Sequence, residues 1–317
     1  MDEPRLTGRR VLITGGAGFI GSHLARTLDA ANEVVVLDDF SVGSRRRCPA
    51  GSTVVEGDIC DAEVLERAVR EVDVIFHQAA VVSVDRTVES PRQTTATNVD
   101  GTLAVLERAR KEDIRVVLAS SAAVYGDPDR VPIPESAPLE PESPYGLQKL
   151  TADRFGRLYA ELYDLPVVAL RYFNVYGPGQ RGPYSGVIST FLQQAAHGHP
   201  LTVEGDGDQT RDFVHVTDVV RANLLAATTE HVGRAFNVAT GVRTSITDLA
   251  ETVRSVLDAS VPVVYESPRS GDIRHSCGDV TTAATDLGFE ARRSLEDGLA
   301  ALVTRTDSQA RLGATDR

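Results

Sequence analysis

Near its amino terminus the chain reads Val11-Leu-Ile-Thr14-Gly15-Gly-Ala-Gly18-Phe-Ile-Gly21, and a helical pattern follows from Ser22 to Leu28. A β-branched apolar run, a glycine turn and a helix in this order predict a phosphate-binding corner. Gly15 permits the tight turn, Gly18 lets the backbone approach a pyrophosphate, and Gly21 lets the helix pack on the strand. The start of the helix then offers free N–H groups and the positive end of its dipole to the phosphates.

A second apolar run, Glu33 to Leu37, ends at Asp38. An acid about twenty residues past the glycines is placed to bind the ribose 2′-hydroxyl, and it would repel a 2′-phosphate. The sequence therefore predicts dinucleotide binding, with NAD favoured over NADP. The arginines at 45–47 lie downstream and could reach a 2′-phosphate, but we favour a solvated loop there.

The rest of the amino-terminal half alternates apolar runs with helical patterns. The runs lie at 53–56, 72–77, 114–119 and 166–171, and the helical patterns at 61–70, 91–110 and 145–163. This alternation predicts an α/β fold, a Rossmann-type doubly wound parallel sheet. After residue 174, Gly and Pro punctuate a loop and mixed pieces follow. These predict helices at 186–196, 216–228, 246–257 and 281–287 and strands at 201–203, 212–214 and 235–238.

Two lobes follow from this change of pattern. We expect a dinucleotide-binding domain from 1–175 plus 213–241, and a smaller mixed α/β carboxy-terminal substrate lobe from 176–212 plus 242–303. The polar end at 304–317 is expected to be a frayed tail.

Composition narrows the class of protein. The 317 residues are 42% hydrophobic and 25% charged, ordinary for a soluble globular protein, and no apolar run approaches the length of a membrane span. A net charge of -12 argues against nucleic acid as the main partner. The three cysteines show neither a CxxC nor a metal-ligand spacing, and no signal peptide is visible. We therefore expect reduced thiols, no metal site, no membrane partner and a cytoplasmic location.

A third feature is the stretch from Ser120 to Lys149. The chain has only two lysines, Lys111 and Lys149, and Lys149 lies four residues after Tyr145. On a helix the two side chains share one face. A free phenol has a pKa of about 10, and a fixed ammonium nearby would lower it and favour the phenolate. An ordinary amphipathic helix produces the same spacing, so the surroundings have to distinguish the two interpretations.

Those surroundings are the ends of the predicted strands. Ser120 and Ser121 leave the carboxyl end of the run at 114–119, where ligands bind in open α/β sheets. The stretch Gln78-Ala79-Ala80, with its small residues, would let the backbone lie beside a cofactor. Asp58 and Ile59 could lie against the edge of an adenine ring. His77, at the end of its strand, is expected to be packed rather than catalytic. Gly101, inside the helix at 91–110, indicates the close approach of another group.

Several motifs together show a resemblance. They are Gly15-x-x-Gly18-x-x-Gly21, Ser120-Ser-Ala-Ala-Val-Tyr-Gly126, Tyr145-x-x-x-Lys149, Arg171-Tyr-Phe-Asn174, Gly207-Asp-Gln-Thr-Arg211-Asp-Phe-Val214 and Arg269-Ser-Gly-Asp272. From about residue 10 to 302 the chain resembles the extended short-chain dehydrogenase/reductase family. Within that family it looks most like the nucleotide-sugar 4-epimerases of the UDP-glucose (UDP-galactose) type.

The resemblance implies a catalytic trio and a cofactor, NAD. Tyr145 would take the proton from a sugar hydroxyl, Lys149 would bind the nicotinamide ribose and tune Tyr145, and Ser121 would hydrogen-bond the reacting oxygen. NAD would take the hydride from C4, the keto sugar would turn over in the pocket, and the hydride would return to its other face. The cofactor-binding residues are predicted to be Gly15, Gly18, Phe19, Ile20, Gly21, Asp38, Asp58, Ile59, Gln78, Ala79, Ala80, Asn98, Ser120, Tyr145, Lys149 and Tyr172.

The same resemblance implies a nucleotide-sugar substrate, held mainly by the carboxy-terminal lobe. Arg211 and Arg269 would clamp its diphosphate, for which paired guanidinium forks are suited, and Asn174 would contact the same region. The substrate-binding residues are predicted to be Ser121, Ala122, Tyr145, Asn174, Val187, Arg211, Arg269, Asp272 and Ser276. A homodimer is expected through the helices near 98–110 and 145–163, on the ground of resemblance alone.

Departures from related enzymes point to the subtype. Sister dehydratases and decarboxylases carry an acid just after the position of Ser121, whereas Ala122 and Ala123 cannot transfer a proton. We therefore expect 4-epimerisation, most simply of UDP-glucose and UDP-galactose. Ser276 is small where a large aromatic would exclude an N-acetyl group, so UDP-N-acetylhexosamines are expected to fit. The alternatives are a UDP-glucuronate, dTDP- or GDP-sugar epimerase, a reductase, or a non-catalytic NAD-binding sensor.

Overall fold

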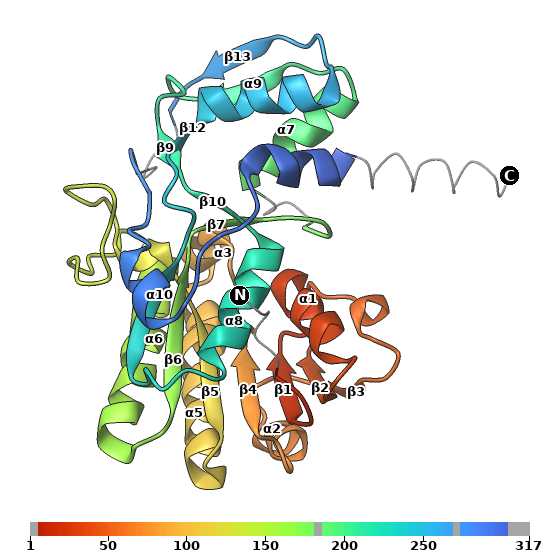
Figure 1. The fold of residues 1–317 in the computed structure, drawn as a ribbon, viewed down its shortest axis with the longest axis vertical. Coiled ribbons are helices and arrows are strands. Elements are labelled where there is room, and N and C mark those ends of the chain that lie inside the picture. Colours follow the sequence, from red (N-terminus) through yellow and green to blue (C-terminus); the bar gives the residue numbers. More distant parts are fainter. Residues whose placement is uncertain (1–5, 181–185, 269–272, 304–317) are drawn as a thin grey trace, which may run out of the picture.

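The structure, a computed structural model, describes residues 6–180, 186–268 and 273–303. Its centre is one seven-stranded sheet in the order β11-β6-β5-β4-β1-β2-β3, in which every neighbouring pair is parallel (Figure 1). The strands are β1 (Arg10–Thr14), β2 (Glu33–Asp38), β3 (Thr53–Glu56), β4 (Val74–His77), β5 (Arg115–Ser121), β6 (Val167–Tyr172) and β11 (Arg234–Val238). The predicted Rossmann-type doubly wound sheet is confirmed.

The strand order reverses at β1, which pairs with β2 on one side and with β4 on the other. In open α/β sheets the crevice at such a switch point, outside the carboxyl ends of the strands, is where ligands bind. The glycine turn leaves β1 at this edge, and Gln78 leaves β4 beside it. The fold therefore brings together the two segments that the sequence assigned to the cofactor.

Both faces of the sheet are buried, as a parallel sheet requires. Val11 and Ile13 of β1 pack into the core on one face, together with residues of α1 (Phe19–Leu28), α8 (Val216–Ala226) and α10 (Thr281–Asp286). Leu12 packs on the other face with residues of α2 (Ala62–Ala68), α5 (Gly101–Glu112) and α6 (Pro144–Tyr163). This alternation along one strand explains why the strands read as continuous apolar runs.

The helix predicted at 91–110 is not regular. It consists of α4 (Pro91–Thr95), a π-helical turn at Ala96–Asp100 and α5. A Cβ atom on Gly101 would lie 2.5 Å from Cδ1 of Ile59, so the close approach expected at this glycine is that of the Ile59 side chain. The π turn contains Asn98 and is a local distortion that hydrophobic periodicity does not reveal. A short helix that the sequence did not indicate, α3 (Val84–Glu89), precedes it.

A separate apolar core lies beyond the carboxyl edge of the sheet. It is built from α7 (Gly186–Ala196), α9 (Ile246–Leu257), β8 (Leu201–Glu204), β13 (Val263–Glu266) and a final helix at 295–303. Short pairs connect this lobe: β8 with β13, β9 (Thr210–Arg211) with β12 (Thr244–Ser245), and β10 (Phe213–His215) with β7 (Asn174–Tyr176). α10 packs instead against the sheet, beside β11.

The tail predicted at 304–317 lies outside the described residues. Within residues 6–180, 186–268 and 273–303, no helix has both the length and the apolar character needed to cross a bilayer.

Candidate active site

The glycine turn forms a tight corner at the end of β1. Gly15 has φ +66, and a Cβ atom there would lie 2.8 Å from the backbone of Ala79, which leaves β4. A Cβ atom on Gly21 would lie 2.2 Å from the carbonyl oxygen of Gly15, so α1 packs directly on the turn. Gly18 begins α1 without a side-chain cap, and the first turn contains no acid. The N–H groups of Phe19, Ile20 and Gly21 have no acceptors within the helix, and this cradle fits a pyrophosphate.

Asp38 connects the end of β2 to the glycine turn. Its Oδ2 accepts a hydrogen bond from the Ala17 N–H at 2.9 Å, and its Oδ1 accepts one from the Phe40 N–H at 2.9 Å. Burial raises the pKa of this carboxyl, and the two N–H bonds oppose that rise. The carboxylate thus lies at the turn, as ribose recognition would require, and it also fixes the turn's shape.

The arginine loop after β2 makes contacts within the protein. Arg45 forms an exposed ion pair with Glu56 at 3.3 Å, and Arg47 donates to the carbonyl oxygen of Gly179 at 2.9 Å. These contacts agree with the surface loop that we favoured over a 2′-phosphate site.

Two polar clusters hold the segment that leaves β4. Gln78 donates to the Tyr172 hydroxyl at 3.2 Å and to Oδ1 of Asn223 on α8 at 3.1 Å. Asn98 fixes the backbone of Val81, three residues further on, by accepting from its N–H at 2.7 Å and donating to its carbonyl oxygen at 2.9 Å. Its amide also donates to Gln148 of α6 at 2.7 Å. Gln78, Tyr172 and Asn98, all predicted to bind the cofactor, therefore shape the backbone around the switch point. Asn223 was not predicted.

His77 is packed, as expected. Its ring nitrogens lie 2.7 Å from the Thr14 hydroxyl and 2.9 Å from the Thr102 hydroxyl. Burial, assisted by the positive charge of Lys149, lowers its pKa to about 3, so the ring stays neutral. It fastens β1 to β4 and α5 below the site.

The start of α6 places Tyr145 beside Ser121. The Ser143 side chain caps the helix by accepting from the Gly146 N–H at 3.0 Å, and Pro144 occupies the first turn. A Cβ atom on Gly146 would lie 2.6 Å from the carbonyl oxygen of Ala123, so the helix lies directly against the 3₁₀ turn Ala122–Val124. Across this contact the Ser121 hydroxyl lies close enough to the Tyr145 phenol to lower its pKa.

Lys149 lies one turn further along α6 and is 7% exposed. Its Nζ donates to the carbonyl oxygen of Ala119 on β5 at 3.0 Å, and burial lowers its pKa to about 8. The expectation that the ammonium lowers the pKa of Tyr145 is not met in this structure. Burial raises the pKa of that phenol, and the Ser121 hydroxyl opposes the rise.

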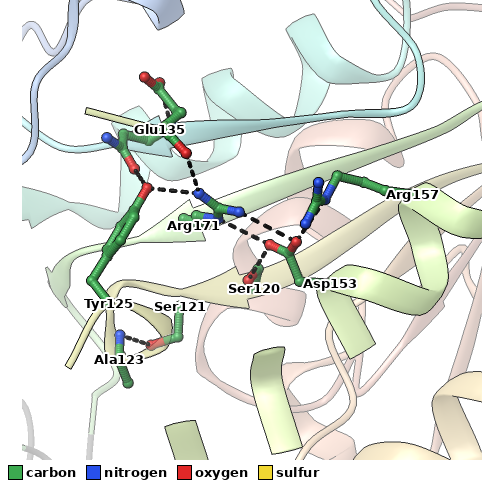
Figure 2. Close-up of polar contacts among 9 residues, drawn as sticks. Ser120, Ser121, Ala123, Tyr125, Glu135, Asp153, Arg157 and Arg171 are labelled. Atoms are coloured by element: carbon green, nitrogen blue, oxygen red, sulfur yellow. Dashed lines mark hydrogen bonds and ion pairs between the residues drawn. The ribbon is translucent and has the colours of Figure 1, made fainter. Parts of the chain in front are cut away.

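Ser120 belongs to a buried ionic network behind the site (Figure 2). Its hydroxyl donates to Asp153 of α6 at 3.0 Å, and Asp153 also accepts from Nε of Arg171 on β6 at 3.0 Å. Nη1 of Arg171 donates to the Tyr125 hydroxyl at 2.9 Å and to the carbonyl oxygen of Glu135 at 3.0 Å. The Ser120 side chain, predicted to contact the cofactor, is therefore directed into this network. Asp153 and Tyr125 were not singled out, since nothing in their local sequence indicates burial.

The predicted substrate residues lie around β9. Arg211 ends β9 and donates to the Thr210 carbonyl at 2.9 Å, and the Ser276 N–H donates to the same carbonyl oxygen at 3.0 Å. The chain thus brings Arg211 and Ser276 together, and Ser276 is 3% exposed. Asn174 on β7 is exposed, Val187 on α7 is half-buried, and Ala122 is half-buried beside Ser121. Arg269 and Asp272 lie outside the described residues, and so does the clamp that the two arginines were predicted to form.

Asp212, which follows Arg211, fixes this arrangement. Its fully buried carboxylate accepts from the backbone N–H of Thr240 at 2.8 Å, of Gly241 at 2.9 Å and of Gly278 at 3.3 Å. It therefore ties β9 to the loop after β11 and to the residues after Ser276. In the described part of the chain, no group of three or more His, Cys, Asp or Glu side chains is placed to hold a metal ion.

Comparison with known proteins identifies the class. Residues 11–239 match the NAD dependent epimerase/dehydratase family. The chain belongs to that family. It is 38% identical over 299 residues to a putative UDP-glucose 4-epimerase of Methanocaldococcus jannaschii, covering 92% of this chain and 97% of the relative.

Solved structures of epimerase/dehydratase proteins share the whole fold. A UDP-N-acetylglucosamine 4-epimerase of Methanobrevibacter ruminantium, in complex with UDP-N-acetylmuramic acid, has a TM-score of 0.92 at 34% identity, covering 96% of this chain and all of the other (100%). A UDP-glucose 4-epimerase of Thermotoga maritima with UDP-glucose has a TM-score of 0.91 at 36% identity, covering 95% of this chain and 99% of the other.

Relatives with other reactions match as well. They include a UDP-glucuronic acid decarboxylase of Arabidopsis thaliana at 33% identity, with 93% of this chain and 69% of the relative covered, and a dTDP-glucose 4,6-dehydratase of Streptomyces venezuelae with NAD bound at 35% identity, with 94% and 97% covered. The chain is therefore an NAD-dependent enzyme of the nucleotide-sugar epimerase/dehydratase family, and its own side chains must distinguish the reaction.

Proposed function

We propose that this enzyme is a UDP-sugar 4-epimerase that interconverts UDP-glucose and UDP-galactose by transient oxidation at C4. The observation that carries the proposal is the placement of the Ser121 hydroxyl beside the Tyr145 phenol, with only the methyl side chains of Ala122 and Ala123 following Ser121. The pair offers a proton acceptor and a partner donor to one sugar hydroxyl, as general acid–base catalysis requires.

Each residue of the pair has a separate task. Tyr145 accepts the proton of the C4 hydroxyl and later returns it. The Ser121 oxygen accepts the Ala123 N–H at 3.1 Å, which fixes its position, and its hydroxyl beside Tyr145 would donate to the sugar oxygen when the substrate is bound. Lys149, held at Ala119, supplies a fixed positive charge at the base of the site. NAD, when bound, supplies the hydride acceptor and then the hydride donor.

The 3₁₀ turn disfavours the other family reactions. Ala122 and Ala123 are half-buried there, immediately beside Ser121. Elimination of water would need an acid or base at this place, and a methyl group can neither give nor take a proton. Within the described residues, the turn that follows Ser121 thus offers no acid or base for elimination, which supports epimerisation over dehydration.

The cofactor side supports NAD. The cradle of Gly15, Gly18 and Gly21 fits a pyrophosphate, and Asp38 places a carboxylate at the turn, where it would accept from ribose hydroxyls and repel a 2′-phosphate. We further propose that the core around β8, β13, α7 and α9 belongs to the nucleotide-sugar lobe. Arg211 and Arg269 would bind the diphosphate there.

Acceptance of UDP-N-acetylhexosamines is part of the proposal. It is supported by the small side chain of Ser276 and by relatives named both as UDP-glucose and as UDP-N-acetylglucosamine 4-epimerases. Conversion of UDP-glucose without conversion of UDP-N-acetylglucosamine would contradict this part alone.

The deciding experiment is a panel of UDP-, dTDP- and GDP-sugars with the product epimers resolved by NMR. The expected result is C4 inversion of UDP-hexoses with no net change in absorbance at the NADH wavelength. Inversion only of dTDP- or GDP-sugars or of UDP-glucuronate would overturn the assigned substrate. Stoichiometric NADH production or loss of water would overturn the reaction itself.

We also propose a homodimer through α5 and α6. Leu147, Leu158 and Leu162 of α6 are 57%, 42% and 59% exposed, an apolar surface that a partner helix would cover. Light scattering should give twice the chain mass, and Leu158→Glu with Leu162→Glu should reduce it to a monomer. A monomeric wild-type protein would contradict the dimer without affecting the proposed chemistry.

A further inference from the structure

A cavity lies on the face of the sheet that carries α1 and α8. The two helices pack side by side (Figure 1), and the segment that leads into the helix at 295–303 is bound to α8 through Asp218. The cavity between these three pieces has a volume of about 680 Å³. It is lined by His23 of α1, by Asp218 and Arg221 of α8, and by Arg292 and Arg293 of the carboxy-terminal segment, among others. None of its lining residues was predicted to bind the cofactor or the substrate.

The cavity wall is positively charged in a protein whose net charge is -12. Three of its side chains are arginines, and its two carboxylates already have partners. Asp218 accepts from Nη2 of Arg221 and from the backbone N–H groups of Arg292 and Arg293, each at 3.1 Å. Asp297 accepts from the Ser294 hydroxyl at 2.7 Å.

These contacts give the arginines fixed positions. Asp218 is 3% exposed, so its bonds to the backbone of residues 292 and 293 anchor the segment that carries both guanidinium groups. Arg221 is held further by the carbonyl oxygen of Glu290 and lies over the ring of Phe289. Within the described residues, no hydrogen bond or ion pair engages the guanidinium of Arg293. The cluster therefore retains a donor group for an anion from outside.

Size and chemistry together point to one class of ligand. Cavities of about 300–1,000 Å³ hold small molecules. Guanidinium forks match the geometry of phosphate oxygens, and Val220 and Leu224 add an apolar wall. We propose that this groove, the α1–α8 groove, binds a small phosphorylated metabolite at a site separate from the active site. The proposal is independent of the reaction assigned above.

The groove is also connected to the cofactor end of the sheet. α8 presents Asp218 and Arg221 to the groove. Asn223, two residues after Arg221, accepts from Gln78 and donates to the Tyr172 hydroxyl at 2.9 Å. On the other wall, His23 follows the glycine turn by less than a turn of helix and contacts the Pro178 carbonyl at 2.8 Å. A ligand that bridges α1, α8 and the carboxy-terminal segment therefore stabilises the folded protein.

The test is calorimetric titration of the full chain, saturated with NAD, with inorganic pyrophosphate and separately with glucose 6-phosphate. It is performed in an Arg211→Ala background, which weakens phosphate binding at the substrate site. At least one probe is expected to bind. Arg293→Glu should weaken this binding about tenfold or more, because it replaces a guanidinium that would bind phosphate with a carboxylate that repels it. Arg293→Gln should give a smaller loss, and Arg67→Glu, an exposed charge reversal on α2, should give none.

Two results would overturn the proposal. One is that neither probe binds at millimolar concentration to the Arg211→Ala protein. The other is that Arg293→Glu, folded as judged by circular dichroism, binds both probes as tightly as the Arg67→Glu control.

Discussion

Lys149 directs its Nζ to the carbonyl oxygen of Ala119 at 3.0 Å, and this bond joins the helix that carries Tyr145 to the end of β5. The side chain is buried, so the ammonium lies in a poorly solvating place with one strong acceptor. Its position is set by the strand and not by the phenol. A charge fixed in this way is pre-organised for the site, and its burial opposes folding.

The cost of burying the Lys149 ammonium should be measurable in the free energy of unfolding. The pKa of Lys149 falls from 10.5 to about 8 in the folded protein, which corresponds to about 3 kcal/mol. Lys149→Met should therefore raise the free energy of unfolding of NAD-free protein at pH 7 by up to this amount, while it lowers turnover by about a hundredfold or more.

The pH dependence of this effect has a definite sign. Between pH 8 and 10.5 the unfolded lysine holds its proton and the folded one has lost it, so the contribution of Lys149 to stability rises with pH. The wild-type protein and the methionine variant should thus converge in urea denaturation as the pH rises from 8 to 10.5. A difference that stays constant over this range would show that Lys149 is not destabilised by burial.

Tyr145→Phe should remove the proton acceptor and leave the binding surfaces intact. We expect turnover to fall by about 10²–10⁴-fold, the usual contribution of a general base, with NAD still bound. Tyr265→Phe, an exposed tyrosine on β13, is the matched control and should retain activity. Product NMR and the absorbance of the purified protein give the two measurements, and a Tyr145→Phe enzyme of normal activity would refute the mechanism.

Asp38→Asn should weaken NAD binding and relax discrimination against NADP. The amide removes the negative charge that would repel a 2′-phosphate, and it weakens the hydrogen bond from the Ala17 N–H that fixes the glycine turn. Titration of each cofactor should show NAD affinity falling by about tenfold or more, the range expected when a charged acceptor is lost. Asp39→Asn, the exposed neighbour, should change neither affinity. If the two variants showed the same ratio of NAD to NADP affinity, Asp38 would have no role in cofactor recognition.

Asp153→Asn should be strongly destabilising. The carboxylate is fully buried against Arg171, which is 2% exposed. Burial alone would raise the pKa of Asp153, and the charge and hydrogen bonds of Arg171 and Arg157 hold it below its ordinary value. Its contribution is therefore present near pH 7 and is lost as the pH falls through that lowered pKa.

Urea denaturation should show a loss of about 3–5 kcal/mol for Asp153→Asn, because Arg171 is left buried without its counter-ion. Glu66→Gln breaks the exposed pair with Arg108 and should cost less than about 1 kcal/mol. Equal losses in the two variants would mean that the buried network is not a stabilising element.

Much of the fold and part of the site could be predicted. The apolar runs identified all seven strands of the sheet, since a strand buried on both faces is continuously hydrophobic. The glycine spacing located the corner at β1, and the spacing of Tyr145 and Lys149 located the helix that carries them. The π turn at Asn98 and the short pairs around β9 were not predictable. They depend on contacts between distant segments, such as Asn98 with Val81 and Thr210 with Ser276.

By itself the sequence determined the order of strands and helices, the glycine turn with its acid, the Tyr145 and Lys149 spacing and the alanines after Ser121. These are local properties of the chain, fixed by periodicity and residue type. Only the tertiary structure decided which charged and polar side chains are buried and which groups surround them. It directs Lys149 to the Ala119 carbonyl and raises the pKa of Tyr145. It also points the Ser120 hydroxyl toward the Asp153–Arg171 network and brings three arginines together at the α1–α8 groove. Solvation and Coulomb interactions depend on neighbours in space, and neighbours far apart in the chain become adjacent only on folding.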